Sequence, residues 1–201
     1  MATIPVYTIG YGNRSIQDFI ALLQRYEIQY LVDIRSQPYS RFNPDYSQKA
    51  LQQYLKQHSI GYIFMGDQLG GQPKERSLHR ESLTEKSQID YEKLAQSEAY
   101  KKGIERIQHA LRQQRRIVLM CSELKPTMCH RGKLVGKTLS KLGFEVIHID
   151  EKGNQKTQLQ LNRILDGAAG EDHPTLFEEW GVSNDEVGHS RKKYTIGEEE
   201  F

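Results

Sequence analysis

The segment RIVLMCSELKPTMCHRGKLVGKTLSKLG, residues 116–143, predicts a buried β-strand, a loop and an amphipathic helix. Ile117 to Met120 form a short apolar run of β-favouring residues, which is typical of a strand covered on both faces. Pro126 interrupts the connection, and a helical period begins at about Cys129 and stops at Gly143. The apolar side of this helix would carry Leu134, Val135, Leu139 and Leu142. Because ligands bind at the carboxyl ends of strands in open α/β sheets, this element is the leading candidate for a site.

Four other apolar runs alternate with helical periods along the chain. The expected strands are 6–11, 30–34, 60–65 and 145–149, and the expected helices are about 16–26, 47–58 and 97–113, with one more short helix after Asp150. Strands that alternate with helices are typical of a parallel, doubly wound sheet. The sequence therefore predicts a three-layer α/β/α fold with a mainly parallel sheet of about five strands.

The 201 residues are enough for one domain with a substantial core. We expect this domain over residues 1–182, with the polar, weakly periodic segment 72–96 as a flap or insertion. Acidic residues gather near the end of the chain, and residues 183–201 are expected to form a flexible acidic tail.

Composition narrows the class of protein. No apolar run is long enough to span a membrane, and the N-terminal segment lacks the pattern of a secretory signal. These absences predict a cytoplasmic protein. In such a protein, two cysteines are expected to be free thiols rather than a structural disulfide. The formal charge of +2 alone does not indicate a nucleic-acid binder, although the acidic tail leaves the first 150 residues more basic.

Cys121 is the strongest single candidate because a thiol between a strand end and a helix N-terminus can lose its proton easily. It would act as a nucleophile, with Glu123 or His130 moving protons. The alternative is that Cys121 is a small apolar residue of the core.

Cys129, His130 and Arg131 begin the following helix, where free backbone N–H groups attract anions. Arg131 would add a bidentate donor for phosphate or carboxylate. The alternative is that Arg131 pairs with Glu123 or Asp33 and has only a structural role. A metal site at these residues is disfavoured because the two cysteines are eight residues apart and adjacent helical residues point in different directions. We therefore expect neither a metal nor a cofactor.

Three other loops should reach the same edge of a parallel sheet. Asp33 would orient Arg35, and the arginines Arg35 and Arg41 suit a phosphate, with Tyr39 and Phe42 available for an aromatic ring. A solvated loop fixed by two prolines is nearly as good an interpretation. The turn after the first strand and the glycine pair after the third would allow the backbone to approach a ligand, through Gly10, Asn13, Gly70 and Gly71. No dinucleotide or P-loop pattern is present.

Four motifs together resemble the bacterial and archaeal domain of unknown function 488 family. They are YTIGYGNRS, LVDIRSQPYSRFNPDYS, the GY-x-x-x-x-x-x-LGG of Gly61 to Gly71, and LMCSELKPTMCHR, and the resemblance spans about Tyr7 to Ile149. The positions similar in pattern are Gly10, Asp33, Arg35, Pro38, Ser40, Leu69, Gly70, Gly71, Cys121, Glu123, Cys129, His130 and Arg131. The resemblance implies a three-layer α/β fold and brings no established reaction. Many relatives carry a histidine and a small residue where this chain has Tyr11 and Gly12, so a histidine base is not expected there.

Three functions remain open at the level of sequence. The leading hypothesis is a cysteine-dependent transferase or hydrolase that binds a phosphate-bearing ligand, either a nucleotide or a nucleic acid. The second is a non-catalytic regulatory module that binds single-stranded nucleic acid, in which Cys121 belongs to the core. The third is a thiol redox sensor that uses Cys121 and Cys129.

Overall fold

The computed structural model describes residues 4–73, 79–80 and 88–167. Met1–Asp166 form one compact unit, and Gly167–Phe201 group separately. Every helix and strand named below belongs to the first unit. The predicted domain boundary at residue 182 and the predicted acidic tail lie outside the described residues.

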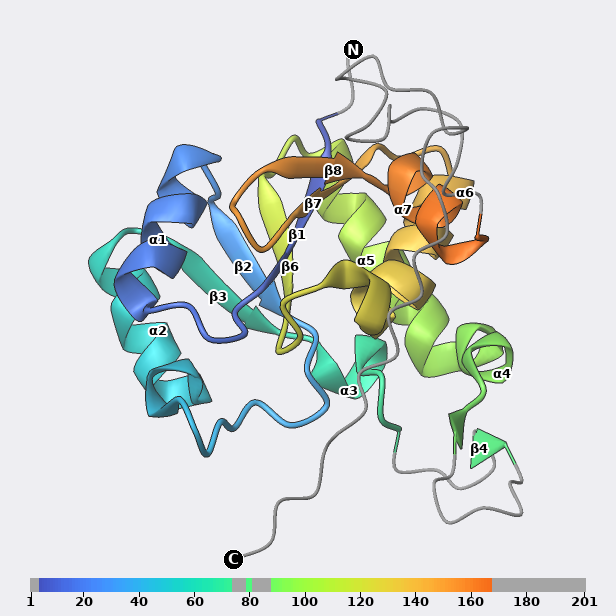
Figure 1. The fold of residues 1–201 in the computed structure, drawn as a ribbon, viewed down its shortest axis with the longest axis horizontal. Helices are drawn as coiled ribbons and strands as arrows, with labels where there is room; N and C mark the ends of the chain where they lie inside the picture. The colour runs from blue at the N-terminus through green and yellow to red at the C-terminus, as the bar shows by residue number, and fades with distance from the viewer. Residues whose placement is uncertain (1–3, 74–78, 81–87, 168–201) are drawn as a thin grey trace, which may run out of the picture. The chain divides into compact units, whose positions relative to one another are not determined.

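Six strands form one sheet in the order β3-β2-β6-β1-β7-β8 (Figure 1). The strands are β1 (Val6–Gly10), β2 (Tyr30–Asp33), β3 (Gly61–Phe64), β6 (Ile117–Cys121), β7 (Val146–Ile149) and β8 (Gln155–Thr157). The first five in that order are parallel, and β8 pairs with β7 in the antiparallel direction. Strand β6 lies between β1 and β2, with Cys121 beside Gly10 in the register. The loops after β1, β2 and β6 therefore leave the sheet at one edge.

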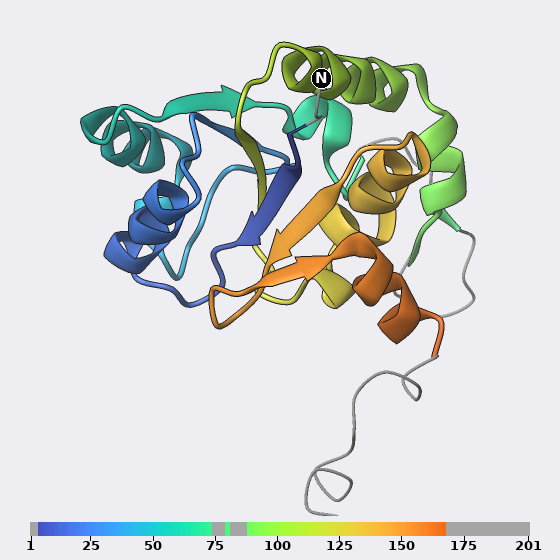
Figure 2. The ribbon, with the colours of Figure 1, turned by 90° about the horizontal axis from the view of Figure 1, so that it is seen from above.

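Helices cover both faces of this sheet, as Figure 2 shows. On one face, α1 (Ile16–Arg25) and α2 (Gln48–Gln57) pack on Val118 and Met120 of β6. On the other face, α5 (Glu98–Arg112) and α6 (Lys137–Lys141) pack around Ile117 and Leu119. Successive side chains of a strand point to opposite faces, so a strand buried on both faces needs an uninterrupted apolar run.

The remaining helical elements are short. They are α3 (Gly66–Leu69), α4 (Tyr91–Gln96) and α7 (Gln158–Leu165), together with the 3₁₀ turns η1 (Pro44–Tyr46) and η3 (Pro126–Met128) and the π-helical turn η4 (Arg131–Gly136). Ser15 caps α1 by accepting the N–H of Asp18, and Thr157 forms a capping box with Gln160 at the start of α7. These side chains satisfy N–H groups that a helix start leaves free.

The predicted α/β fold with helices on both faces of a mainly parallel sheet is confirmed. The sheet has one strand more than expected, because β8 is a short polar edge strand. The helix expected from Cys129 begins as the π-helical turn η4, and Leu142, predicted to be apolar-side, is half exposed. Of the segment 72–96, the structure describes the antiparallel pair β4 (His79–Arg80) and β5 (Gln88–Ile89), and α4.

None of the helices within the described residues has the length and apolar character that crossing a bilayer requires.

Candidate functional site

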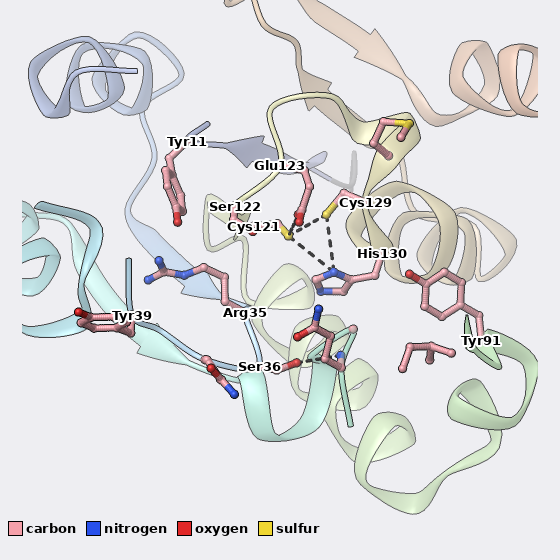
Figure 3. Close-up of a pocket in the computed structure, with 15 residues that line it drawn as sticks. Tyr11, Arg35, Ser36, Tyr39, Tyr91, Cys121, Ser122, Glu123, Cys129 and His130 are labelled. Carbon is pink, nitrogen blue, oxygen red and sulfur yellow. Dashed lines mark hydrogen bonds between the residues drawn. The ribbon is translucent and has the colours of Figure 1, made fainter. Parts of the chain in front are cut away.

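A cavity of about 410 Å³ opens where β1, β2 and β6 end (Figure 3). Its walls come from the loops after these strands, from Gly71 and Gln72 after α3, and from the start of α4. The lining residues are Tyr11, Arg35, Ser36, Gln37, Tyr39, Gly71, Gln72, Ile89, Tyr91, Cys121, Ser122, Glu123, Met128, Cys129 and His130. The predicted meeting of separate loops at one edge of the sheet thus brings Arg35, Cys121 and His130 to a single cavity.

Two sulfur atoms and one imidazole meet at one end of this cavity. The Sγ atoms of Cys121 and Cys129 lie 2.7 Å apart, and each lies 3.6 Å from Nδ1 of His130. Oε2 of Glu123 lies 2.8 Å from the Cys121 sulfur. Both cysteines are free thiols and both are buried. The thiol redox hypothesis requires the two sulfurs to lie close enough to form a disulfide, and their separation meets this condition.

The backbone explains why Cys129 and His130 face the same point although they are adjacent. Cys129 ends the turn η3 in an extended conformation, with φ −128° and ψ 148°, and His130 already has helical angles, with φ −58° and ψ −24°. The expectation that these two side chains point in different directions is wrong because Cys129 precedes the helix. One argument against a metal site is removed with it, and the other, the eight-residue spacing of the cysteines, is met by the 2.7 Å separation of their sulfurs.

The His130 ring is held from two sides. Its Nε2 lies 3.1 Å from the carbonyl oxygen of Ile34, which accepts the Nε2 proton and leaves Nδ1 facing the sulfurs. A Cβ atom on Gly71 would come within 2.5 Å of Cγ of His130. The backbone of Gly71 therefore packs directly against the imidazole, and only a glycine leaves room for this contact.

The cluster changes the acidity of its members. The thiol of Cys129 and the His130 ring stabilise the Cys121 thiolate and lower the pKa of Cys121 to about 6, against the effect of burial. Burial and the hydrogen bond to Cys121 raise the pKa of Cys129. Burial alone would lower the pKa of His130, but its contact with Cys121 outweighs burial and raises it. Burial would raise the pKa of Glu123, yet hydrogen bonds from the two thiols lower it.

Arg35 lies at the other end of the cavity, beside Tyr11 and Tyr39 (Figure 3). Its Nε and Nη2 donate to the two carboxylate oxygens of Asp33, at 2.9 and 2.6 Å, and Tyr62 donates to Oδ2 of the same carboxylate. The guanidinium also lies over the Tyr11 ring, 5.3 Å from its centroid. Arg35 is only 4% exposed, and its Nη1 is buried without a hydrogen-bond partner among the described residues. Asp33 orients Arg35, as the sequence suggested.

Arg131 does not line the cavity, so the geometry gives no support to its predicted role in anion binding. It is fully buried, and it donates through Nη1 to Thr8 and through Nη2 to the backbone carbonyls of Glu123 and Leu124. These bonds fix the loop that carries Glu123. The geometry therefore supports the structural alternative, with main-chain carbonyls rather than a carboxylate as partners.

Comparison with known proteins gives one match. The family model described as Domain of unknown function DUF488 matches residues 15–137, which is more than half of the chain. The chain belongs to this family. No curated protein and no solved structure matches it.

The match to the DUF488 family covers Arg35 and the group formed by Cys121, Glu123, Cys129 and His130. Gly10, Tyr11 and Asn13 precede the matched residues. Gly10 packs against the backbone carbonyl of Glu123 and not against the cavity. A Cβ at this position would collide with that carbonyl oxygen. Asn13 and Arg41 are exposed and do not line the cavity. Gly70 borders a neighbouring cavity of about 750 Å³ instead. The predicted ligand roles of these four residues therefore have no geometric support here.

Several lining residues of this DUF488 chain were not singled out by sequence reasoning. Tyr11 follows the first strand and stacks on Tyr46, with 4.2 Å between the ring centroids. Ser122 could have been found by its place between Cys121 and Glu123. Ile89 and Tyr91 come from the segment 72–96, whose weak periodicity gave no signal.

Proposed function

We propose that this DUF488 protein is an enzyme that transfers or hydrolyses a phosphate ester, with Cys121 as the nucleophile. Arg35 binds a non-bridging phosphate oxygen through Nη1. His130, oriented by the Ile34 carbonyl, carries the proton. The ligand is a phosphate-bearing small molecule, and the protein acts in the cytoplasm.

One observation carries this proposal: Arg35 and Cys121 line the same open cavity, and the buried Nη1 of Arg35 has no hydrogen-bond partner among the described residues. A buried guanidinium with an unused N–H is costly unless a ligand uses it, because buried polar groups are ordinarily paired. Nucleophile, base and orienting group are also arranged in the order that cysteine–histidine catalysis needs, from Cys121 through His130 to the Ile34 carbonyl.

The chemical step balances with these residues. The Cys121 thiolate forms a bond to phosphorus while the bond from phosphorus to the leaving oxygen breaks, and the His130 imidazolium gives that oxygen its proton. Water, or an acceptor hydroxyl, then attacks phosphorus and gives its proton to neutral His130. The sulfur–phosphorus bond breaks and the thiolate returns. Arg35 stabilises the charge that gathers on the phosphate oxygens in both steps.

Iodoacetamide labelling at one fixed pH tests the proposal on protein that is reduced and treated with a chelator. Peptide mass spectrometry assigns the label to Cys121 or Cys129. We expect Cys121 to be labelled first, and inorganic phosphate or a nucleoside monophosphate to slow this labelling several-fold in the unmodified chain but not in Arg35→Gln. Arg41→Gln is the matched control, since Arg41 is an exposed arginine of the same loop, and it should keep the protection. An unreactive Cys121, or labelling that phosphate leaves unchanged, would exclude the nucleophile or the anion site respectively.

Turnover is a separate measurement. With p-nitrophenyl phosphate as a generic ester, Cys121→Ser should lose product formation while keeping the circular dichroism spectrum of the parent chain. Product formation by folded Cys121→Ser at the parent rate would contradict a covalent role for this sulfur.

The loop after β2 favours a second candidate function, the binding of single-stranded nucleic acid. Tyr39 is 72% exposed at the cavity and Phe42 is 95% exposed, with the guanidinium of Arg41 5.9 Å from the Phe42 ring centroid. Exposed aromatic rings beside arginine suit stacked bases of single-stranded nucleic acid. Salt-dependent binding of an oligonucleotide that survives Cys121→Ala and disappears in Phe42→Ala would support this function. No binding at low salt would exclude it.

A further inference from the structure

The geometry points to a binding site for one thiophilic divalent cation, Zn²⁺ above all, formed by Sγ of Cys121, Sγ of Cys129 and Nδ1 of His130. A fourth coordination position faces the cavity. This proposal does not depend on the proposed enzyme function, because it is argued only from the positions of the three ligand atoms.

The separations of the three donors fit a tetrahedral ion closely. All three ligand atoms lie within 4.8 Å of one another. Bond lengths of about 2.3 Å to sulfur and about 2.0–2.1 Å to nitrogen place tetrahedral S and N ligands about 3.6 Å apart and two S ligands about 3.8 Å apart. Both S···N distances are already 3.6 Å. Only the S···S distance of 2.7 Å must widen, by about 1 Å, which a small rotation of one cysteine side chain provides.

The surroundings of the donors resemble the outer shell of a metal site. Ligating histidines usually donate their second ring N–H to a backbone carbonyl or carboxylate, and Nε2 of His130 faces the Ile34 carbonyl at 3.1 Å. The backbone N–H of Arg131 lies 3.5 Å from the Cys129 sulfur, where it can stabilise a thiolate. The first contact orients His130 through the ring nitrogen that would not bind the ion, and the second stabilises the negative charge of a sulfur ligand.

The chemistry of the donors selects the metal. Two thiolates and one imidazole form a soft set that favours Zn²⁺ over Mg²⁺ or Ca²⁺, which prefer oxygen ligands. Three protein ligands with an open position are typical of catalytic rather than structural zinc sites. Oε2 of Glu123, 2.8 Å from the Cys121 sulfur, lies where it can complete the coordination or hold a bound water.

Metal binding and nucleophilic attack would use the same electron pair of Cys121. A bound ion would therefore protect Cys121 from alkylation, whereas the chelated protein would expose it. The two proposals can fail separately, since alkylation of the metal-free chain tests the nucleophile and a spectroscopic signal from the metal tests the site.

Titration with Co²⁺ under reducing conditions tests the metal site directly. We expect one Co²⁺ per chain, with a sulfur-to-cobalt charge-transfer band in the near ultraviolet and the visible absorption of a four-coordinate ion. Stoichiometric Zn²⁺ should displace the Co²⁺ and abolish both bands. Cys129→Ser should weaken binding by at least about 100-fold, the upper end of the losses that outer-shell changes alone produce.

Matched variants make the result decisive. Met128→Leu removes the sulfur of the neighbouring residue, which is exposed and is not among the donors, and it should leave the bands unchanged. His130→Gln should lose affinity as Cys129→Ser does, which covers the case in which one of the two fails to fold. A reduced parent chain without a charge-transfer band, or a band that persists in both ligand variants, would overturn the inference.

Discussion

Arg35 donates to both carboxylate oxygens of Asp33, through Nε at 2.9 Å and Nη2 at 2.6 Å, and keeps Nη1 for another partner. The pair is buried, so each charge depends on the other. The planar guanidinium can hold Asp33 with one edge and a ligand with the remaining nitrogen, which a lysine ammonium group cannot do. Under the proposed function, this pair would therefore link the stability of the fold to the binding of an anion.

Arg35→Lys separates these two roles. A lysine keeps the charge beside Asp33 but loses the two-point contact, so the free energy of unfolding should fall by about 1–3 kcal/mol. Phosphate should no longer protect Cys121 from iodoacetamide, because no second nitrogen reaches into the cavity. Urea unfolding and the labelling rate measure the two effects. Arg41→Lys, at an exposed position, should change stability by less than about 0.5 kcal/mol. Unaltered phosphate protection in Arg35→Lys would contradict the assigned role of Nη1.

Gly71→Ala should disturb the site through His130. The added Cβ would lie 2.5 Å from Cγ of the imidazole, so the ring or the loop must move. We expect a loss of about 1–3 kcal/mol in unfolding free energy, as for other overpacked sites, and weaker Co²⁺ binding. Thermal unfolding and the cobalt titration measure these effects.

The double variant Gly71→Ala/His130→Ala is the control. Removing the ring removes the contacts with Cγ and Nδ1 and leaves the one with Cβ of residue 130, at 2.8 Å, so the double variant should recover part of the loss and be more stable than the sum of the two single changes predicts. Strictly additive losses would show that Gly71 does not act through His130.

Arg131→Met should destabilise the whole fold. The change leaves Thr8 and the carbonyls of Glu123 and Leu124 without their donor, and each buried acceptor left unpaired costs about 1–3 kcal/mol. We expect a total loss of at least about 3 kcal/mol in urea unfolding. Lys133→Met, two residues along the same π-helical turn and exposed, should be nearly neutral. A stable Arg131→Met protein that loses only phosphate binding would restore the anion role predicted from the sequence.

The contrast between Arg35 and Arg131 shows what sequence patterns can predict about this site. The apolar run of β6 and the alternation of strands and helices were enough to predict a parallel sheet, and with it the loops that meet at one edge. They could not predict which way a side chain turns within that edge. Arg131 turns inward to backbone carbonyls and Arg35 turns toward the cavity, because the backbone of each loop sets these directions.

Two further differences from the sequence prediction, the extra strand β8 and the later start of the helix after Cys129, have a similar cause. Strand β8 is an edge strand in which Gln155 and Thr157 are exposed, so it lacks the apolar alternation that identifies a strand. Cys129 was assigned to a helix, but the turn η3 delays the helix and leaves Cys129 extended. Turn geometry depends on contacts along the folded chain, and a single sequence carries little signal for it.

His148 predicts how stability depends on pH. It is fully buried on β7, where Nε2 donates to Oε1 of Gln158 at 2.8 Å and Nδ1 accepts the hydroxyl proton of Thr8 at 2.6 Å. Burial lowers its pKa to about 4, against the effect of the Gln158 hydrogen bond, and the charges of Arg131 and Lys156 lower it further. The folded protein therefore resists protonation of His148 more than the unfolded chain does.

The sign of the effect follows from this shift. Because the folded pKa is below the unfolded value of about 6.5, the contribution of His148 is complete above pH 6.5 and is lost as the pH falls toward 4, by up to about 3 kcal/mol. Urea unfolding at pH values between 7 and 4 should therefore show the difference in stability between the parent chain and His148→Gln shrinking across this window. His109→Gln, at an exposed histidine of α5, should show no such narrowing, and this comparison separates His148 from other titrating groups. A constant difference between the parent chain and His148→Gln would mean that His148 takes up its proton as readily in the folded protein as in the unfolded chain, with Thr8 and Gln158 rearranging to accept its charge.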